Sequence, residues 1–202
     1  MPLWLGTQPL VLASKSASRC ALLEAAGIPV EIRPANIDER AIEARLGSSD
    51  PAGVAALLAR AKANAVATAM SGRLVLGADQ TLALDTQRFS KPKDRNAAAE
   101  QLRALRGKTH ALHSAVAIAR DGAIAFEYVE VARLTMRAFS EEFLQRYLDA
   151  AGAAVTASVG AYQLEGLGVQ LFERVEGDHS TILGLPLLPL LDWLRQAGLL
   201  AG

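Results

Sequence analysis

The sequence is poor in cysteine, histidine and aromatic residues, and it has no excess of charge of either sign. Its single cysteine, Cys20, excludes an internal disulfide and favours a reducing compartment. A formal net charge of +0 argues against a surface built for nucleic acid, which usually needs a basic excess. The histidines, His110, His113 and His179, lack metal-ligand spacing, so we interpret them as structural or surface groups.

Long hydrophobic runs are also missing. The late apolar stretch at residues 182–191 is too short to span a bilayer and contains Pro186 and Pro189. Near the start, no Lys or Arg precedes the apolar residues 3–5, so we expect no signal peptide. These absences predict a cytoplasmic protein that binds neither a membrane nor nucleic acid.

What is present indicates one globular α/β domain over residues 1–202. A content of 51% hydrophobic and 21% charged residues is that of a protein with a sizeable core. Apolar segments at residues 10–13, 29–34, 74–76 and 169–172 predict short strands, and helical patterns lie between them. Asp121-Gly122 predicts a hairpin, so we expect a mixed β-sheet with flanking helices.

The segment at residues 74–81, LVLGADQT, is an apolar run that ends in a carboxylate. We predict a buried strand from Leu74 to Leu76, with Asp79 at the point where the strand leaves the core. A carboxylate there, next to a glycine that lets another group come close, is well placed to hold a metal ion or a water. The alternative is an ordinary turn aspartate.

A second segment, Ser14-Lys15-Ser16-Ala17-Ser18-Arg19, leads into a helix with Ser16 as the expected N-cap. Lys15 and Arg19 flank the positive end of that helix, where cations are disfavoured by about 0.3–1 kcal/mol each. A bound anion would reverse that sign, and serine hydroxyls with free backbone N–H groups complete a phosphate cradle. Alternatively, both cations point into water.

Further charged residues admit two interpretations each. Asp38 and Glu39 are either solvated loop charges or supply a second carboxylate that faces Asp79 across a magnesium ion. Lys62, at the edge of a helical apolar stripe, either extends to water or reaches into a cleft. Lys91 precedes a proline, which restricts its backbone and suits a cation held in a fixed direction, although a surface lysine is the default.

Together these segments resemble the Maf family of nucleoside triphosphate pyrophosphatases over nearly the whole chain. The resemblance implies a twisted mixed sheet in two lobes around a cleft, a Maf/ITPase-like fold, and it leaves a homodimer possible. It implies metal-dependent hydrolysis of a nucleoside triphosphate to the monophosphate and pyrophosphate. The matching pieces occur in the family's order: Ala13-Ser14-Lys15-Ser16 with Arg19 and Leu22-Leu23, Asp38-Glu39, Ala61-Lys62-Ala63, Gly77-Ala78-Asp79, Lys91-Pro92, Gly160-Ala161-Tyr162 and Gly184-Leu185-Pro186-Leu187.

By this resemblance Asp79 is the catalytic acid, and Asp79 and Glu39 hold a divalent cation, Mg²⁺ or Mn²⁺. A water activated by Asp79 or by the metal attacks the α-phosphorus, and pyrophosphate leaves. The substrate is a small-molecule nucleoside triphosphate. The residues expected to bind it are Ser14, Ser16, Ser18, Arg19, Lys62, Gln80, Lys91 and Glu165.

The base preference is expected to be 7-methyl-GTP, so that modified nucleotides are removed before incorporation. Gln80 stands where the dTTP/UTP branch of the family has threonine, and residues 165–168 and 171–174 resemble the 7-methyl-GTP branch. Glu165 can accept hydrogen bonds from a guanine edge and favours a positively charged base. Ser18, Cys20 and Ser90 differ from the tryptophan, arginine and glycine expected at their positions.

Three other functions stay open. The first is dTTP/UTP pyrophosphatase activity within the same family. The second is a nucleotide-binding regulator of cell division with little catalysis. The third, an aspartyl-phosphate phosphatase, is disfavoured because that chemistry needs an acid two residues after Asp79, where Thr81 stands.

Overall fold

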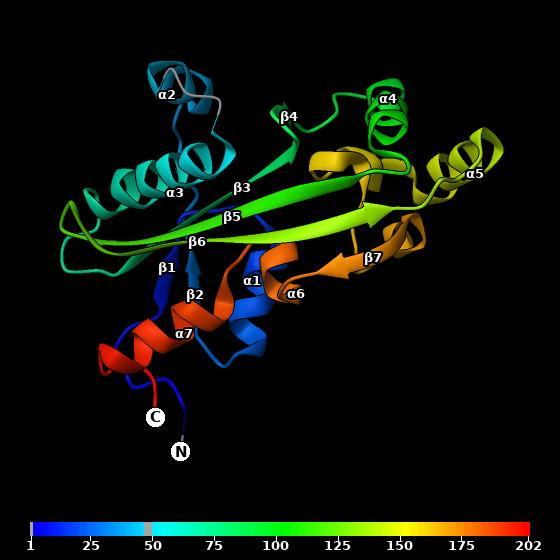
Figure 1. The fold of residues 1–202 in the computed structure, drawn as a ribbon. Coiled ribbons are helices and arrows are strands. Elements are labelled where there is room, and N and C mark those ends of the chain that lie inside the picture. Colours follow the sequence, from blue (N-terminus) through cyan, green and yellow to red (C-terminus); the bar gives the residue numbers. More distant parts are fainter. Residues whose placement is uncertain (1, 47–49) are drawn as a thin grey trace. The chain divides into compact units, whose positions relative to one another are not determined.

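The computed structural model describes residues 2–46 and 50–202. Helices and strands alternate over much of the chain, as expected for an α/β protein (Figure 1). The strands are β1 (Leu10–Leu12), β2 (Val30–Ile32), β3 (Val75–Leu84), β4 (Gln87–Phe89), β5 (Thr109–Arg120), β6 (Ala123–Met136) and β7 (Phe172–Glu176). The α-helices are α1 (Ala17–Ala25), α2 (Glu39–Leu46), α3 (Pro51–Ala67), α4 (Arg95–Leu105), α5 (Glu141–Ala151), α6 (His179–Ile182) and α7 (Leu187–Gln196).

In the described ranges the strands form one seven-stranded sheet with the order β2-β1-β3-β5-β6-β7, and β4 pairs with β3. The strand β1 pairs in parallel with both β2 and β3, whereas β4 and β7 pair antiparallel with β3 and β6. The expected mixed sheet with flanking helices is therefore confirmed. The Asp121-Gly122 hairpin between β5 and β6 is also confirmed, with positive φ at both residues.

The chain divides into two compact units. The first comprises Met1–Gln80, Ser114–Glu130 and Asp178–Gly202, and the second comprises Thr81–His113 and Val131–Gly177. The long strands β3, β5 and β6 contribute residues to both units.

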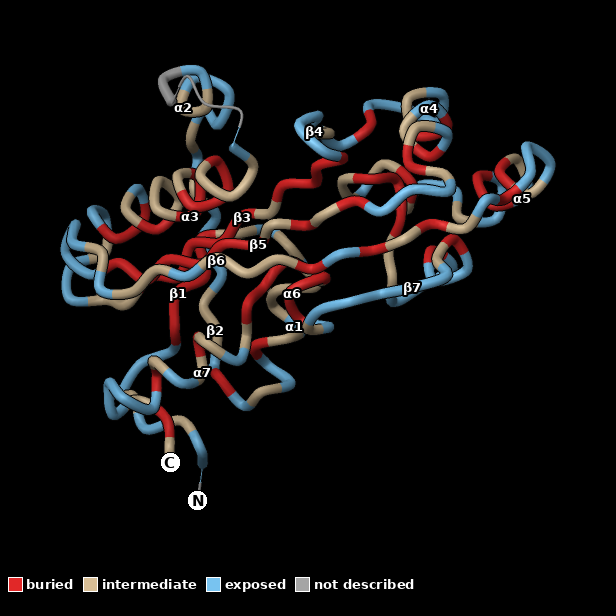
Figure 2. Tube along the Cα trace, viewed as in Figure 1, coloured by how far each residue is buried: buried red, intermediate tan, exposed pale blue. Residues whose placement is uncertain are grey.

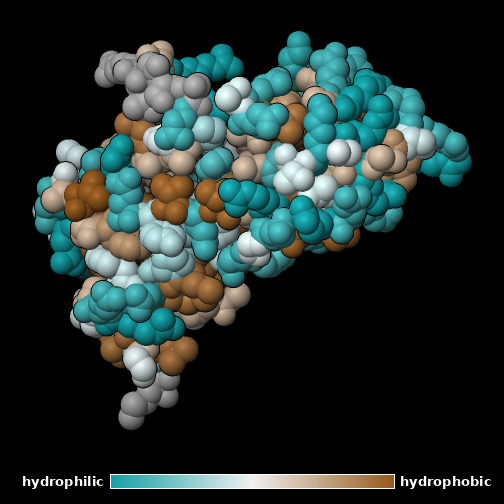
Figure 3. Space-filling view, viewed as in Figure 1, coloured by the Kyte–Doolittle hydropathy of each residue, from teal (hydrophilic) through white to brown (hydrophobic). Residues whose placement is uncertain are grey.

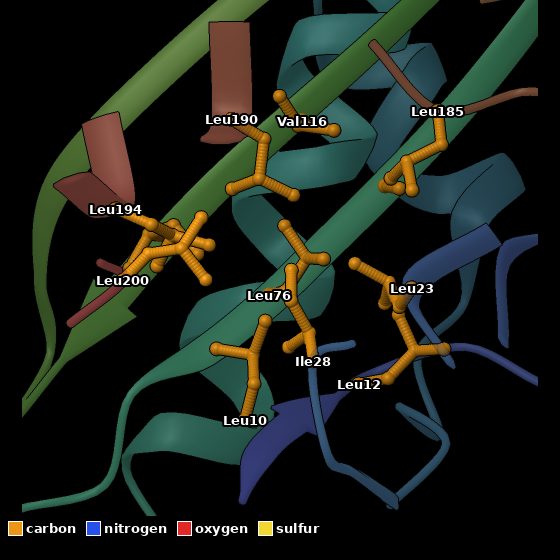
Figure 4. Close-up of a cluster of buried hydrophobic side chains, with 12 residues drawn as sticks. Leu10, Leu12, Leu23, Ile28, Leu76, Val116, Leu185, Leu190, Leu194 and Leu200 are labelled. Atoms are coloured by element: carbon orange, nitrogen blue, oxygen red, sulfur yellow. The ribbon is translucent and has the colours of Figure 1, made fainter. Parts of the chain in front are cut away.

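One face of the sheet in the first unit packs against α1 and α7. Figure 4 shows this cluster, in which Leu10, Leu76 and Val116 come from three strands. Leu23 of α1 and Leu190 and Leu194 of α7 cover them. The strand β1 is buried along its whole length (Figure 2), as expected for a strand with neighbours on both sides.

The opposite face of the same sheet packs against α3, and it is lined by small side chains. Ala115, Ala117 and Ala119 of β5 alternate with the large residues that face α1 and α7. On α3, the buried residues at this contact include Ala55, Ala59 and Ala63. Small residues on both partners let the helix backbone approach the sheet closely. This approach places the side chains of α3 next to those of β3.

In the second unit, His110 of β5 lies in an aromatic cluster with Tyr162 and Phe172. It is 1% exposed, and its Nε2 lies 2.7 Å from the hydroxyl of Tyr162. The Nδ1 atom of His110 is buried without a partner in the described part of the chain. Burial in this cluster lowers the pKa of His110 to about 4.

We therefore expect acid destabilisation of the fold through His110. The unfolded chain, with a histidine pKa near ~6.5, binds a proton more readily than the folded chain between pH ~6.5 and ~4. The free energy of unfolding should accordingly fall by about 2 kcal/mol from pH 7 to pH 5. Urea unfolding at both pH values measures the change. His110→Gln should remove most of this difference, whereas His179→Gln, at an exposed position, should keep it.

The structure corrects three expectations about secondary structure. The strand expected at residues 74–76 extends through Val75–Leu84, because β1, β4 and β5 pair with it. The strand expected at residues 169–172 is a 3₁₀ turn at Leu167–Leu171, and the strand β7 follows it. The connection expected at residues 36–40 ends at Glu39, which begins α2.

None of the helices in residues 2–46 and 50–202 has the length and apolar character needed to cross a bilayer. On the face shown in Figure 3, hydrophobic residues are interspersed among hydrophilic ones.

Candidate active site

Asp79 lies in the middle of β3, not at its end as the sequence predicted. Leu76 and Ala78 face the cluster under α1 and α7, whereas Val75 faces α3. Since side chains alternate along a strand, Gly77 and Asp79 share the α3 face with Val75. Asp79 is only 8% exposed, so its carboxylate is held by the surrounding structure rather than by a mobile turn.

Lys62 of α3 reaches inward to this carboxylate. Its Nζ lies 2.5 Å from Oδ1 of Asp79, and both side chains are 12% exposed. The same Nζ lies 2.9 Å from Oε1 of Glu39, at the start of α2. The alternative in which Lys62 extends to water is thus wrong. Glu39 begins α2 and is not a loop charge, and it shares the Lys62 ammonium group with Asp79. That the two carboxylates face each other across a metal ion stays a prediction.

Arg19 of α1 bonds to two backbone carbonyl groups, one of which belongs to Ala78, the residue before Asp79 on β3. Its Nη1 donates to the carbonyl oxygen of Ala78 over 2.8 Å, and its Nε donates to the carbonyl oxygen of Gly184 over 2.8 Å. Nη1 also lies 3.3 Å from Oγ of Ser14. The guanidinium is therefore directed into the protein, whereas Lys15 is exposed. Of the two expected cations at this helix end, only Arg19 joins the cluster.

The serines of this segment have distinct positions. Ser16 is the N-cap of α1, as predicted, and its side chain accepts from the backbone N–H of Arg19. Ser14 Oγ accepts from the backbone N–H of Ser16 over 3.2 Å. Ser18 lies partly exposed in the first turn of α1. The first turn of α1 contains no acidic residue, which leaves its positive end favourable for an anion.

The electrostatic environment of the site combines burial with alternating charges. Burial raises the pKa of the Asp79 carboxyl, and the nearby Lys62 and Arg19 oppose this rise. Burial lowers the pKa of the Arg19 guanidinium, and the carboxylates of Asp79 and Glu39 oppose that fall. The negative charges of Asp79 and Glu39 and the positive charges of Lys62 and Arg19, which come from four separate segments, therefore offset one another at this site.

The donor set suits a hard divalent cation. Oxygens of Asp79 and Glu39 already contact one positive group, the Lys62 ammonium, so a single cation can meet both carboxylates. Magnesium prefers oxygen ligands and is commonly held by one or two carboxylates, with water and substrate phosphates completing its shell. Among the described residues no group of three or more His, Cys, Asp or Glu side chains forms a metal site, so these two residues would depend on such additional ligands.

Gln80, next to Asp79 on β3, bonds within the first unit. Its Nε2 donates to Oγ of Ser114 over 2.8 Å and to the carbonyl oxygens of Thr181 and Ile182 over 3.1 Å each. Gln80 is therefore held by β5 and α6. Sequence reasoning did not foresee Ser114, Thr181 or the Gly184 carbonyl as partners of site residues; a serine among apolar residues on a strand's buried face was the available signal.

Two expected substrate-binding residues lie in the second unit. Lys91 follows β4 and Glu165 lies between two 3₁₀ turns, and both are exposed. Their roles stay predictions, as does the role of Ser18.

Comparison with known proteins extends these findings. The model of the family described as Maf-like protein matches residues 9–197. A nucleoside triphosphate pyrophosphatase of Rhodopseudomonas palustris (strain BisB5) is 59% identical over 99% of each chain. One of Nitrobacter hamburgensis is 59% identical over 100% of each chain. A 7-methyl-GTP pyrophosphatase of Rhizobium etli is 52% identical over 97% of this chain and 100% of its own.

Among solved structures, a HAM1 protein from Coxiella burnetii aligns with a TM-score of 0.44 and 15% identity, over 66% of this chain and 75% of that chain.

Proposed function

The chain belongs to the Maf-like protein family, and on that premise we propose that it hydrolyses nucleoside triphosphates, 7-methyl-GTP in particular, to the monophosphate and pyrophosphate. The observation that carries this proposal is the cluster of Asp79, Lys62, Glu39 and Arg19, in which the Asp79 carboxylate is buried. A triphosphate needs cations for its charge, and hydrolysis needs a group that can take a proton from water. The cluster contains both.

Asp79 acts as the general base in this proposal. Lys62 holds Oδ1, so Oδ2 is the carboxylate oxygen that accepts a proton from the attacking water. Burial raises the pKa of Asp79, and a base with a raised pKa takes up a proton more readily near neutral pH. The water attacks the α-phosphorus, and pyrophosphate leaves in line with it.

The cations bind and orient the triphosphate. Arg19 is fixed by two backbone carbonyls, which limits its motion and presents its remaining N–H groups in a constant direction. The N-terminus of α1 near Ser14 and Ser16 adds backbone donors, and Lys91 adds a further charge. When bound by Asp79 and Glu39, Mg²⁺ or Mn²⁺ would neutralise charge that develops on the phosphate oxygens.

Three considerations support a methylated guanine as the base. A relative with 52% identity is named for 7-methyl-GTP. Gln80 occupies the position that has threonine in the dTTP/UTP branch, and Glu165 supplies an acceptor suited to a positively charged base. Several other relatives carry only the broader name, nucleoside triphosphate pyrophosphatase. The hydrolase activity thus has the wider support, and 7-methyl-GTP is the finer part of the proposal.

A nucleotide panel tests both parts. Purified protein is incubated with Mg²⁺ and 7-methyl-GTP, GTP, UTP or dTTP, and monophosphate and pyrophosphate are quantified. We expect 7-methyl-GTP to have the highest kcat/KM, and excess EDTA to abolish turnover. A higher kcat/KM for UTP and dTTP than for 7-methyl-GTP would instead support dTTP/UTP pyrophosphatase activity. Calorimetric binding without any hydrolysis would instead support a regulator.

A further inference from the structure

A group of buried polar side chains around Gln80 has no part in the chemistry proposed above. Ser114 of β5 and Thr181 of α6 are both fully buried. Buried polar groups are retained where hydrogen bonds satisfy them. Here the Ser114 hydroxyl and the Thr181 carbonyl both bond to the side-chain amide of Gln80.

The bonding partners fix which way this amide faces. Two of the three oxygens around Nε2 are backbone carbonyls, of Thr181 and Ile182, and carbonyl oxygens only accept hydrogen bonds. Rotating the amide by half a turn would place Oε1 against both of them. The amino group of Gln80 must therefore face inward.

Ser114 completes this arrangement because its single hydroxyl proton is already committed. Its Oγ donates to the Thr181 carbonyl over 2.7 Å, so the same oxygen must accept from Gln80. The two protons of Nε2 are thereby shared among three acceptors, the Ser114 hydroxyl and the carbonyl oxygens of Thr181 and Ile182. Oε1 is the other polar atom of the Gln80 side chain, and as an amide oxygen it can only accept.

We propose that Ser114 is a positioning residue for base recognition: it holds the Gln80 amide so that Oε1 accepts a hydrogen bond from an N–H group of the nucleobase. This inference rests on the proposed function, because it requires a nucleotide next to Asp79. Guanine presents N–H donors on its base-pairing edge, and so do uracil and thymine. A fixed acceptor loses less conformational freedom on binding than a freely rotating amide.

The short helix α6 supports both Gln80 and Arg19. Carbonyls in the last turn of a helix lack partners within the helix. The carbonyls of Thr181 and Ile182 both accept from Gln80, and that of Thr181 also accepts from Ser114 and from the backbone N–H of Gly184. The Gly184 carbonyl accepts from Arg19. The Thr181 hydroxyl in turn donates to the Glu130 carboxylate. The chain from Thr181 to Gly184 thus holds the side chains of both Gln80 and Arg19.

The test must separate base recognition from simple support of α6. Ser114→Ala and the nearly isosteric Ser114→Cys remove or weaken the acceptor, while Ser114→Thr keeps the hydroxyl. Two constants are measured at the same pH and Mg²⁺ concentration. They are the Michaelis constant, KM, with 7-methyl-GTP as substrate, and the inhibition constant for inorganic tripolyphosphate, which has the phosphates but no base.

We expect Ser114→Ala and Ser114→Cys to raise the KM three- to tenfold and to change the tripolyphosphate constant less than twofold. Ser114→Thr should lie closer to the wild type. Ser71→Ala, which removes a hydroxyl bonded to Asp121 away from the site, should match the wild type in both constants.

Three outcomes overturn the inference. An unchanged KM in Ser114→Ala and Ser114→Cys would overturn it, and so would parallel changes in both constants, which indicate loss of support for the whole site. In either case turnover by the wild type would leave the proposed function standing. If the wild type hydrolyses no triphosphate, the proposed function fails and this role fails with it.

Discussion

Asp79→Asn is expected to lower kcat by about a thousandfold, within the range that general-base catalysis contributes. The asparagine has the same shape, but it cannot accept a proton from water at neutral pH, and its neutral oxygen binds a divalent cation more weakly than a carboxylate. Initial rates of pyrophosphate release under saturating 7-methyl-GTP measure this loss.

The fold should persist in this variant. Lys62 keeps its contact with Glu39 at 2.9 Å, so its ammonium is not left as an unpaired charge. The variant also removes a carboxylate whose charged form is disfavoured by burial. Cooperative thermal unfolding and calorimetric binding of nucleotide by Asp79→Asn would confirm that the loss concerns the chemical step.

Asp192→Asn is the matched control for this substitution. Asp192 is an exposed residue of α7 that accepts a hydrogen bond from Gln196. Its replacement should leave kcat and KM at wild-type values. If Asp79→Asn retained more than a tenth of wild-type turnover, Asp79 would be neither the base nor an essential metal ligand.

Local chemistry in the sequence predicted the ends of elements well. Ser16 caps the helix that the sequence assigned to it, and Asp121-Gly122 forms the hairpin. These features depend on one to four neighbouring residues, since the side-chain oxygen of a cap bonds to N–H groups within its own turn. No distant segment is needed to specify them.

The course of β3 was harder to predict because long-range pairing decides it. Gly77, Asp79 and Gln80 interrupt the apolar run, and glycine and aspartate are disfavoured in strands. Pairing with β1, β4 and β5 overrides these local preferences. The prediction therefore ended the strand too early and treated a buried mid-strand carboxylate as a residue at its tip.

The candidate site was predictable in composition but not in geometry. Asp79, Lys62, Glu39 and Arg19 were each singled out, yet their contacts join residues up to 165 positions apart. Such contacts depend on how a helix lies on the sheet. The binding of Gln80 by Ser114 and α6 also spans long separations, up to 102 positions, so no local pattern could indicate it.

Gly77→Ala should cause the largest loss of stability, about 3 kcal/mol, at the upper end of typical overpacking costs. A Cβ atom on Gly77 would lie 2.1 Å from the backbone oxygen of Ala59 and 2.6 Å from the backbone nitrogen of Ala63. Backbone atoms of a helix cannot move aside as the end of a side chain can, so α3 would have to shift away from β3. Urea unfolding at pH 7 measures the change.

Gly166→Ala is the control for stability. A Cβ atom there would meet only the Gln163 oxygen at 3.8 Å, an ordinary contact, and Gly166 has a negative φ. This variant should unfold within about 0.5 kcal/mol of the wild type, as most substitutions without steric conflict do. Equal stability of Gly77→Ala and the wild type would mean that α3 does not lie against β3 as closely as described.

Gly77→Ala should also impair turnover, because the side chains of residues 77 and 79 lie on the same face of β3, toward α3. Lys62 lies on α3 between Ala59 and Ala63 in sequence, and a Cβ atom on Gly77 would meet the backbone of both alanines. A shift of α3 by about 1 Å would lengthen the contact between Lys62 and Asp79, and misplacement of that size can cost about a hundredfold in rate. The folded fraction of Gly77→Ala at low temperature should therefore show reduced kcat. Glycine at this position is thus as much a requirement of the ion pair as of the packing.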